Sequence, residues 1–219
     1  MPNATLIVTL VVLVTMIAMD KIVRMKVSEH IDALYSAGNG DELLTYLDGF
    51  LVKYLYPAYN RAFMKINALE LTSDFDGEGR ELALLLSEKR LDNEQRHAVV
   101  LRGFEFYLKE GNAQRARELL EEIEGWNGFP SKGMYSILYS VVVEKSAAYI
   151  PLCKDKLQDA QGADKLQLLY LLSKQYENIG QIEKAREYEA QSVELLSELR
   201  SGSACGEAAQ PFATISSED

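Results

Sequence analysis

Two patterns of hydrophobic residues divide this chain near residue 26. Residues 4–19 form an unbroken run of apolar residues and threonine, and the basic residues Lys21, Arg24 and Lys26 follow this run. Beyond that point, apolar side chains recur three and four positions apart, which is the spacing of one face of an amphipathic helix. No stretch longer than five residues alternates as a half-buried strand would. The pattern therefore predicts an all-α protein that begins with an apolar segment.

The periodic part of the chain predicts ten successive helices. Their expected ranges are 20–37, 41–55, 57–71, 78–90, 93–110, 113–125, 131–146, 149–161, 164–179 and 182–199. Glycine-containing turns separate several of these ranges, and glycine readily adopts the left-handed conformation that ends a helix. Pro57 and Pro151 fall in the first turns, where proline is well tolerated. The pattern is lost after Arg200, so we expect residues 201–219 to be a disordered tail.

The run 4–19 predicts an N-terminal membrane anchor. It is shorter than the roughly 20 residues that cross the hydrocarbon core of a bilayer. Ile22 and Val23 extend it, however, because the Lys21 side chain can reach the membrane surface from within the segment. We therefore expect a single transmembrane helix that contacts lipid over residues 4–23.

Two alternatives to an anchor fit the sequence less well. A cleaved signal peptide would need a basic residue before the run, and there is none; it would also need small residues at a cleavage site, and residues 17–21 are a poor match to that pattern. A helix of a soluble core would need a polar face, but residues 6–14 are all aliphatic except for one threonine. Because Lys21, Arg24 and Lys26 all follow the run, the positive-inside rule places the rest of the chain in the cytoplasm.

The chain contains an internal repeat with an offset of 69 residues. The equivalent pairs are Tyr107 and Tyr176, Gly111 and Gly180, Ala116 and Ala185, and Leu119 and Tyr188. The offset corresponds to two units of about 34 residues, a length typical of repeated helical hairpins. In each unit the tyrosine is expected to fill the groove between two helices, the glycine to end the first helix, and the alanine to allow close helix approach.

These residues resemble the tetratricopeptide repeat family, most clearly over 171–188 and more loosely over 103–120. Earlier hairpins at 27–55 and 57–90 follow the same plan by periodicity alone, with Gly40 and Gly79 as candidate turns. The resemblance implies a stack of antiparallel helical hairpins, an α-solenoid, over residues 27–200, behind an anchor and basic segment over 1–26. It also implies a concave face that binds a peptide, a protein segment or a sister subunit. An irregular helical bundle with two similar hairpins is the alternative architecture.

Charge and site chemistry narrow the range of functions. The formal net charge of −10 disfavours binding to nucleic acid, whose phosphates are also negative. His30 and His97 lack the spacing of a zinc site. The turn at 74–79 starts like a calcium-binding EF-hand loop, but Leu85 stands where the final carboxylate should be. We therefore expect no metal and no cofactor.

Cysteine usage points to a reducing compartment. The chain has two cysteines, Cys153 and Cys205, which are too few for a disulfide framework. Cys153 lies in an amphipathic segment and is expected to be a small core residue. No other group of residues has the spacing of a catalytic site, so the sequence does not predict an enzyme.

These features favour a membrane-anchored adaptor or scaffold that binds protein. Tyr135 and Tyr139 lie on one face of an expected helix between the two best repeats, which makes them candidate partner-binding residues, although the same stripe would also suit a core. An acidic domain favours a basic or amphipathic partner. A membrane-tethered enzyme or small-ligand sensor and an accessory subunit of a membrane complex are the alternatives.

Overall fold

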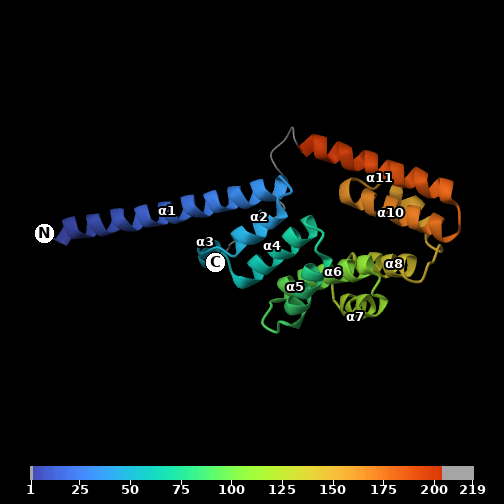
Figure 1. The fold of residues 1–219 in the computed structure, drawn as a ribbon, viewed down its shortest axis with the longest axis horizontal. Coiled ribbons are helices and arrows are strands. Elements are labelled where there is room, and N and C mark those ends of the chain that lie inside the picture. The colour runs from blue at the N-terminus through green and yellow to red at the C-terminus, as the bar shows by residue number, and fades with distance from the viewer. Residues whose placement is uncertain (1, 204–219) are drawn as a thin grey trace. The chain divides into compact units, whose positions relative to one another are not determined.

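The computed structural model describes the backbone of residues 2–203 and the side chains of residues 13–199. The described residues form eleven helices and no strand (Figure 1), so the prediction of an all-α protein is confirmed. The helices are α1 (Pro2–Ser36), α2 (Gly40–Leu47), α3 (Phe50–Leu55), α4 (Ala58–Leu71), α5 (Phe75–Ser87), α6 (Asn93–Glu110), α7 (Ala113–Glu124), α8 (Lys132–Val142), α9 (Ile150–Leu157), α10 (Gly162–Asn178) and α11 (Ile182–Ser203).

Most predicted ranges agree with these helices to within a few residues, but three predictions need correction. The expected helix 41–55 is interrupted, because Gly49 has an extended backbone and starts α3 separately from α2. Gly79 is not a turn, since it lies inside α5. Residues 201–203 of the predicted tail belong to α11, and the rest of that tail lies outside the described residues.

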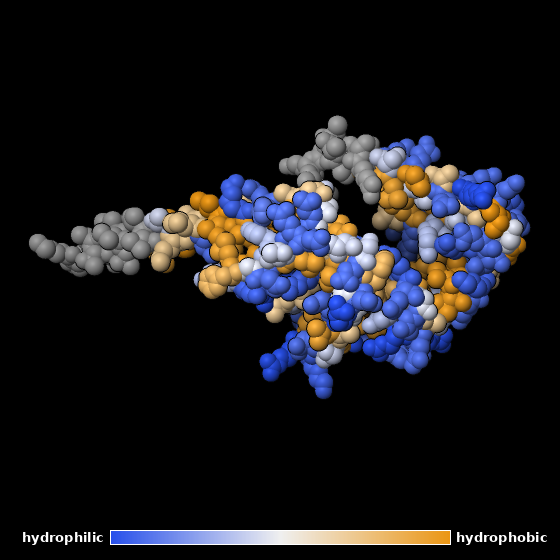
Figure 2. Space-filling model, viewed as in Figure 1, coloured by the Kyte–Doolittle hydropathy of each residue, from blue (hydrophilic) through white to orange (hydrophobic). Residues whose placement is uncertain are grey.

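The predicted anchor and the first predicted amphipathic helix form one continuous helix, α1. Within the residues whose side chains the structure describes, no helix is long and apolar enough to cross a membrane. Those side chains begin at Leu13, so residues 4–12 of the predicted anchor lie outside them. Between residues 13 and 25, α1 exposes a series of large apolar side chains (Figure 2): Leu13, Val14, Met16, Ile17, Met19, Ile22 and Met25.

The chain divides into two compact units within α6, between Gly103 and Phe104. In unit 1, α2 packs against α1, α3 and α4, and α4 packs against α3 and α5. Apolar residues from the second half of α1 through α4 make its main core: Val27, Ile31, Leu34, Leu43, Leu47, Val52, Leu55 and Ala68. Gly40 allows α2 to approach α4 closely, because a Cβ atom at this position would lie 2.8 Å from the carbonyl oxygen of Ala68.

A buried ion pair holds the second half of unit 1 together. The guanidinium of Arg102 on α6 lies 2.9 Å from the carboxylate of Glu78 on α5 and 2.7 Å from that of Glu70 on α4. Only 3% of the Glu78 side chain is exposed. A buried carboxylate needs such a partner, so Arg102 joins three helices through one charge.

Unit 2 is built from helices that pack in succession. Helix α8 contacts α7 and α10, and α10 also contacts α9 and α11. The second half of unit 2 packs around a core of residues from α8, α9, α10 and α11: Val141, Cys153, Leu168, Leu171, Leu172, Tyr176 and Ala185. Helices α8 and α10 are thus direct neighbours although α9 lies between them in the sequence, as in a stack of hairpins.

Five residues with a positive φ angle recur along the chain at nearly equal intervals. Gly38, Ser73, Gly111, Lys145 and Gly180 have φ values of 56° to 78°, and successive members are separated by 35, 38, 34 and 35 residues. Each of them follows a helix and precedes another one. Gly128 and Gly162 also have positive φ but lie outside this series. The recurrence shows that a positive-φ residue stands between two helices about every 35 residues.

Four of these turns share one hydrogen-bonding pattern. The amide after the positive-φ residue donates to a carbonyl five residues earlier: Asn39 to Leu34, Asp74 to Leu69, Asn112 to Tyr107 and Gln181 to Tyr176, at 2.9 to 3.0 Å. This is the pattern of a Schellman motif, which satisfies carbonyls at the end of a helix. The turn at Lys145 is one residue wider, since the Ser146 amide donates to the carbonyl of Ser140.

Candidate functional site

The residues predicted to pack the repeats occupy equivalent positions in two hairpins of unit 2. Ala116 and Ala185 are 0% and 2% exposed, and they lie on α7 and α11, the second helices of these hairpins. Tyr107 and Tyr176 are also buried. Gly111 and Gly180 have φ angles of 78° and 75°, and a Cβ atom added at either glycine would have nothing within 4 Å.

Two cationic side chains extend the equivalence between the two hairpins, and neither was predicted from the sequence. The guanidinium of Arg115 lies 5.7 Å from the centre of the Tyr107 ring, and the ammonium of Lys184 lies 5.4 Å from that of Tyr176. Both distances suit a cation–π contact. Arg115 and Lys184 are also 69 residues apart, so the repeat offset is the signal that could have identified them.

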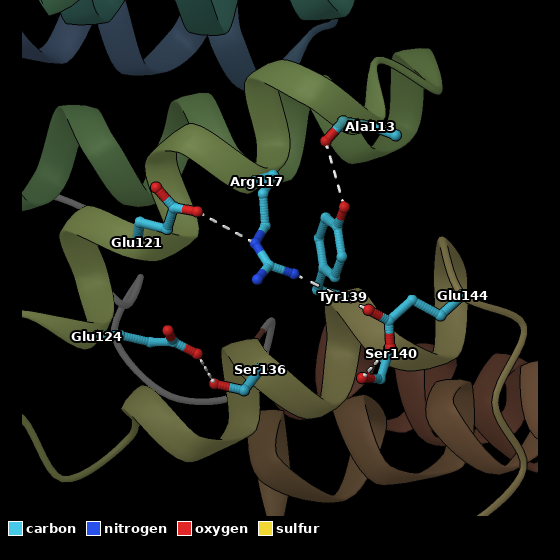
Figure 3. Close-up of polar contacts among 8 residues, drawn as sticks. All are labelled: Ala113, Arg117, Glu121, Glu124, Ser136, Tyr139, Ser140 and Glu144. Atoms are coloured by element: carbon cyan, nitrogen blue, oxygen red, sulfur yellow. Dashed lines mark hydrogen bonds and ion pairs between the residues drawn. The ribbon is translucent and has the colours of Figure 1, made fainter.

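Tyr139, a candidate partner-binding residue, lies between α7 and α8. The residue is 8% exposed, its hydroxyl donates to the carbonyl of Ala113 at 3.4 Å, and the Arg117 guanidinium lies 5.6 Å from the ring centre (Figure 3). Tyr139 therefore fills the contact between two helices and presents little surface to a partner.

Polar contacts around Tyr139 join the same two helices. Ser136 on α8 donates to Glu124 on α7 at 2.8 Å, and Arg117 on α7 lies 3.9 Å from Glu144, which follows α8 (Figure 3). Arg117 also lies 3.3 Å from Glu121 on its own helix. The ion-paired side chains are about half exposed or more, so each pair contributes little to stability.

Tyr135, the other candidate, lies one turn earlier on α8 and is only half-buried. Its ring centre is 5.6 Å from that of Phe104 and 6.0 Å from that of Phe129. Burial raises the pKa of its hydroxyl, and the nearby charge of Glu105 adds to this effect. A tyrosine hydroxyl is protonated at neutral pH even without this shift, so the Tyr135 hydroxyl can act as a hydrogen-bond donor.

Tyr135 lines a groove of about 820 Å³ that runs between the beginnings of α8 and α10 and the end of α9. We call it the acidic groove. Its lining includes the apolar side chains of Met134, Ile137 and Leu168, the carboxylates of Asp155, Asp159 and Asp164, and the side chains of Tyr135, Lys156 and Gln158. Three carboxylates against one ammonium give the groove a negative charge, while its apolar side chains supply surface for hydrophobic contact. Among the residues described, no cluster of three or more His, Cys, Asp or Glu side chains could hold a metal ion.

A second groove, of about 570 Å³, lies on α6, α8 and α10. We call it the lysine groove. Its lining combines Leu108, Leu138, Val141 and Val142 with Lys109, Lys145, Lys174, Glu105, Glu177, Tyr170 and Asn178. The Lys174 ammonium lies 2.8 Å from the Glu177 carboxylate. Asn178 donates to the carbonyls of Val141 and Ser146 at 2.9 and 3.2 Å, so its amide fixes the end of α8 to α10.

Cys153 lies in the core of unit 2, as expected from its amphipathic segment. It is 1% exposed, and the Gln175 amide nitrogen lies 3.6 Å from its sulfur. Burial raises the pKa of the thiol, although the hydrogen bond from Gln175 acts in the opposite direction. A protonated, enclosed thiol is a poor nucleophile.

Gln175 is itself fully buried and connects three parts of the chain. Its side-chain oxygen accepts from the Tyr149 amide at 2.9 Å, and its nitrogen donates to the Leu171 carbonyl at 3.1 Å. This residue was not predicted from the sequence. Its polar side chain stands among the leucines of α10, and a polar residue on an apolar helical face is the signal that could have identified it.

No protein family, curated protein or solved structure matches this chain.

Proposed function

We propose that this protein is a membrane-anchored binding module. In this proposal, the N-terminal part of α1 crosses the bilayer, and the helical hairpins behind it form a tetratricopeptide-like surface in the cytoplasm. The acidic groove of unit 2 binds a basic or amphipathic segment of another protein. The proposal includes no catalytic step and no cofactor.

The observation that carries the binding proposal is the composition of the acidic groove. Asp155, Asp159 and Asp164 line the same groove as the half-buried ring of Tyr135. Aspartates around a groove attract basic side chains and speed association, whereas an aromatic ring beside apolar residues slows dissociation. A basic amphipathic segment would use both kinds of contact.

The recurring turns support the tetratricopeptide-like architecture. Positive-φ residues about every 35 positions agree with the unit of about 34 residues inferred from the sequence repeat. The contacts of α8 with α7 and α10 agree with a stack in which the first helices of successive hairpins are neighbours. Such stacks present continuous surfaces to peptides and proteins, which suits an adaptor.

The tether is supported by the apolar side chains that α1 exposes between residues 13 and 25. These side chains continue the apolar run of the sequence, and exposure of so many on one helix is unfavourable in water. Lys21, Arg24 and Lys26 follow the run, which favours a cytoplasmic location for the units.

Site-specific photo-crosslinking in cells tests the groove assignment. A photo-reactive amino acid at Gln158, an exposed residue of the acidic groove, should produce a discrete adduct with another protein. The same amino acid at Gln114, an exposed residue of α7 outside the groove, is the matched control and should not produce that adduct. The adduct at Gln158 should disappear when the three groove aspartates are changed to asparagine, and it should weaken with Tyr135→Ala. Persistence of the adduct in the triple variant, or the same adduct from both positions, would overturn the assignment.

A further inference from the structure

Helix α3 presents unusually exposed hydrophobic side chains. Phe50 is 85% exposed, Tyr54 is 74% exposed and Leu51 is 44% exposed, whereas Val52 and Leu55 on the same helix are buried. The buried pair attaches α3 to the core of unit 1, so the exposed residues are displayed from a fixed support. Three large side chains within one short helix form a patch, and such patches mark interaction surfaces more often than isolated exposed residues do.

The patch is fixed next to the point where α1 enters unit 1. The guanidinium of Arg24 on α1 donates to the carbonyl of Leu55, the last residue of α3, at 2.9 Å. Val23 packs against the core cluster that contains Leu55. The Arg24 guanidinium also pairs with the Asp20 carboxylate on its own helix, at 2.8 Å. Helix α3 therefore lies beside the basic end of the proposed membrane segment.

The position of Arg24 along α1 sets the depth of α3 relative to a bilayer. The proposed membrane segment ends at Val23, and Arg24 follows it directly, about 1.5 Å farther along the helix. The polar headgroup layer on each side of a bilayer is roughly 5–7 Å thick. When the apolar run of α1 occupies the hydrocarbon core, Arg24 and the end of α3 lie at the level of the headgroups.

We propose that α3 is a second membrane contact, whose Phe50, Leu51 and Tyr54 side chains enter the interface of the bilayer that α1 crosses. This inference rests on the proposed tether. Aromatic rings with a polar edge, such as that of Tyr54, are favoured at the interface. Lys53 lies between these residues and is half exposed. Its ammonium is 3.6 Å from the exposed Asp48 carboxylate, and a pair this open to solvent leaves the ammonium able to reach lipid phosphates while its chain remains near the apolar layer.

A second contact would determine the orientation of unit 1 at the membrane. A single helix allows a domain to tilt and rotate about its attachment. With α3 also bound to the interface, both rotation about α1 and tilt away from the lipid are restricted. Figure 2 shows apolar residues at the surface where α1 enters the folded part of unit 1, which is the region that would face lipid.

Fluorescence quenching by lipid tests the inference on the full chain. The chain has one tryptophan, Trp126, so Phe50→Trp combined with Trp126→Phe places the only indole on α3. The protein is reconstituted into phosphatidylcholine vesicles with and without bromine near the top of the acyl chains. We expect brominated lipid to remove most of the emission of Trp at position 50.

Phe75→Trp combined with Trp126→Phe is the matched control. Phe75 is 48% exposed and is the first residue of α5. It follows Thr72 by three residues, and Thr72 lies near Gly40. Gly40 comes just after the end of α1 that is farther from the proposed membrane segment. The emission of Trp at position 75 should be the same in both kinds of vesicle. Flotation of the vesicles on a density gradient is measured on the same samples, because it reports the tether separately.

The outcomes separate the two proposals. If the chain does not float with the vesicles, both the tether and the second contact are wrong. If it floats but the Trp at position 50 is not quenched, the tether stands and the second contact is overturned. Emission at position 50 that is shifted to the blue but unquenched would show that protein covers the patch, either a second copy or a partner, and would also overturn the lipid assignment.

Discussion

Tyr107 and Tyr176 accept equivalent backbone hydrogen bonds, each at 2.9 Å, from the amide of the residue five positions later. In both hairpins a glycine with positive φ precedes the donor, and a cationic side chain lies over the tyrosine ring. The sequence offset of 69 residues therefore corresponds to one local structure formed twice. This equivalence makes the turns and the buried alanines the most direct places to test the repeat.

Replacement of Gly180 by alanine should destabilise unit 2 by about 1–2 kcal/mol, because its φ angle of 75° is unfavourable for a residue with a Cβ atom. Space is not the reason, since nothing lies within 4 Å of that Cβ position. Gly133 is the matched control: it also has free space around a Cβ, but it lies inside α8 and has no positive φ. Gly133→Ala, at the second residue of α8, should not destabilise and should stabilise by up to about 0.5–1 kcal/mol, because alanine is the better helix former. Urea unfolding followed by circular dichroism measures both, and shifts of the same sign would contradict the explanation.

Enlarging the buried alanines should strain the paired helices. Ala116→Leu or Ala185→Leu inserts extra carbon atoms at a position that is 0% or 2% exposed and should cost on the order of 1–3 kcal/mol. Glu121→Gln on the exposed face of α7 should cost less than about 0.5 kcal/mol. Thermal unfolding measures the three variants. Equal melting temperatures would remove the support for the helix pairing.

Removal of the Arg102 charge should destabilise unit 1 strongly. Arg102→Met removes the ion pair to the Glu78 carboxylate, which is 3% exposed, at a cost on the order of 3 kcal/mol. Arg115→Met is the control, since its partner Glu118 is about half exposed; together with the loss of the cation–π contact to Tyr107, it should cost no more than about 1–2 kcal/mol. The double variant Arg102→Met/Glu78→Leu should recover part of the loss. No recovery would show that Arg102 acts by packing and not through its charge.

The thiol of Cys153 should be unreactive until the protein unfolds. In a Cys205→Ser variant, Cys153 is the only thiol, and a colourimetric thiol reagent should label it at a rate that follows urea unfolding. Burial makes the pKa of the Cys153 thiol higher in the folded protein than in the unfolded protein. The stability that the neutral thiol contributes is therefore complete below the unfolded pKa of about 8.5 and is lost as the pH rises above that value. Rapid labelling of the native protein at about pH 7 would show that the thiol is accessible.

The helices could be predicted from the sequence because amphipathic periodicity and glycine turns are local signals. The turns at Gly38, Gly111 and Gly180 are of this kind, since glycine marks the positive φ directly. The positive-φ turns at Ser73 and Lys145 could not be predicted, because these residue types rarely adopt positive φ.

The candidate site was predicted less completely than the fold. A spacing of four residues places Tyr135 and Tyr139 on one face of α8, but it does not determine which part of that face is covered. Contact with α7 buries Tyr139, whereas Tyr135 reaches the acidic groove. The groove itself requires both α8 and α9 to lie beside α10, and the hydrophobic periodicity of each helix does not specify which helices pack together.

Extraction of the full chain from membranes with alkaline carbonate tests the central claim, that one chain combines a bilayer tether with a helical binding module. The full chain should stay in the membrane pellet and float with lipid, because its apolar run is held in the hydrocarbon core. A chain that begins at Val27, which keeps the core residues of α1 but lacks the run, should be soluble and folded by circular dichroism. Release of the full chain by carbonate, or recovery of a mature chain cut near Asp20, would contradict the account.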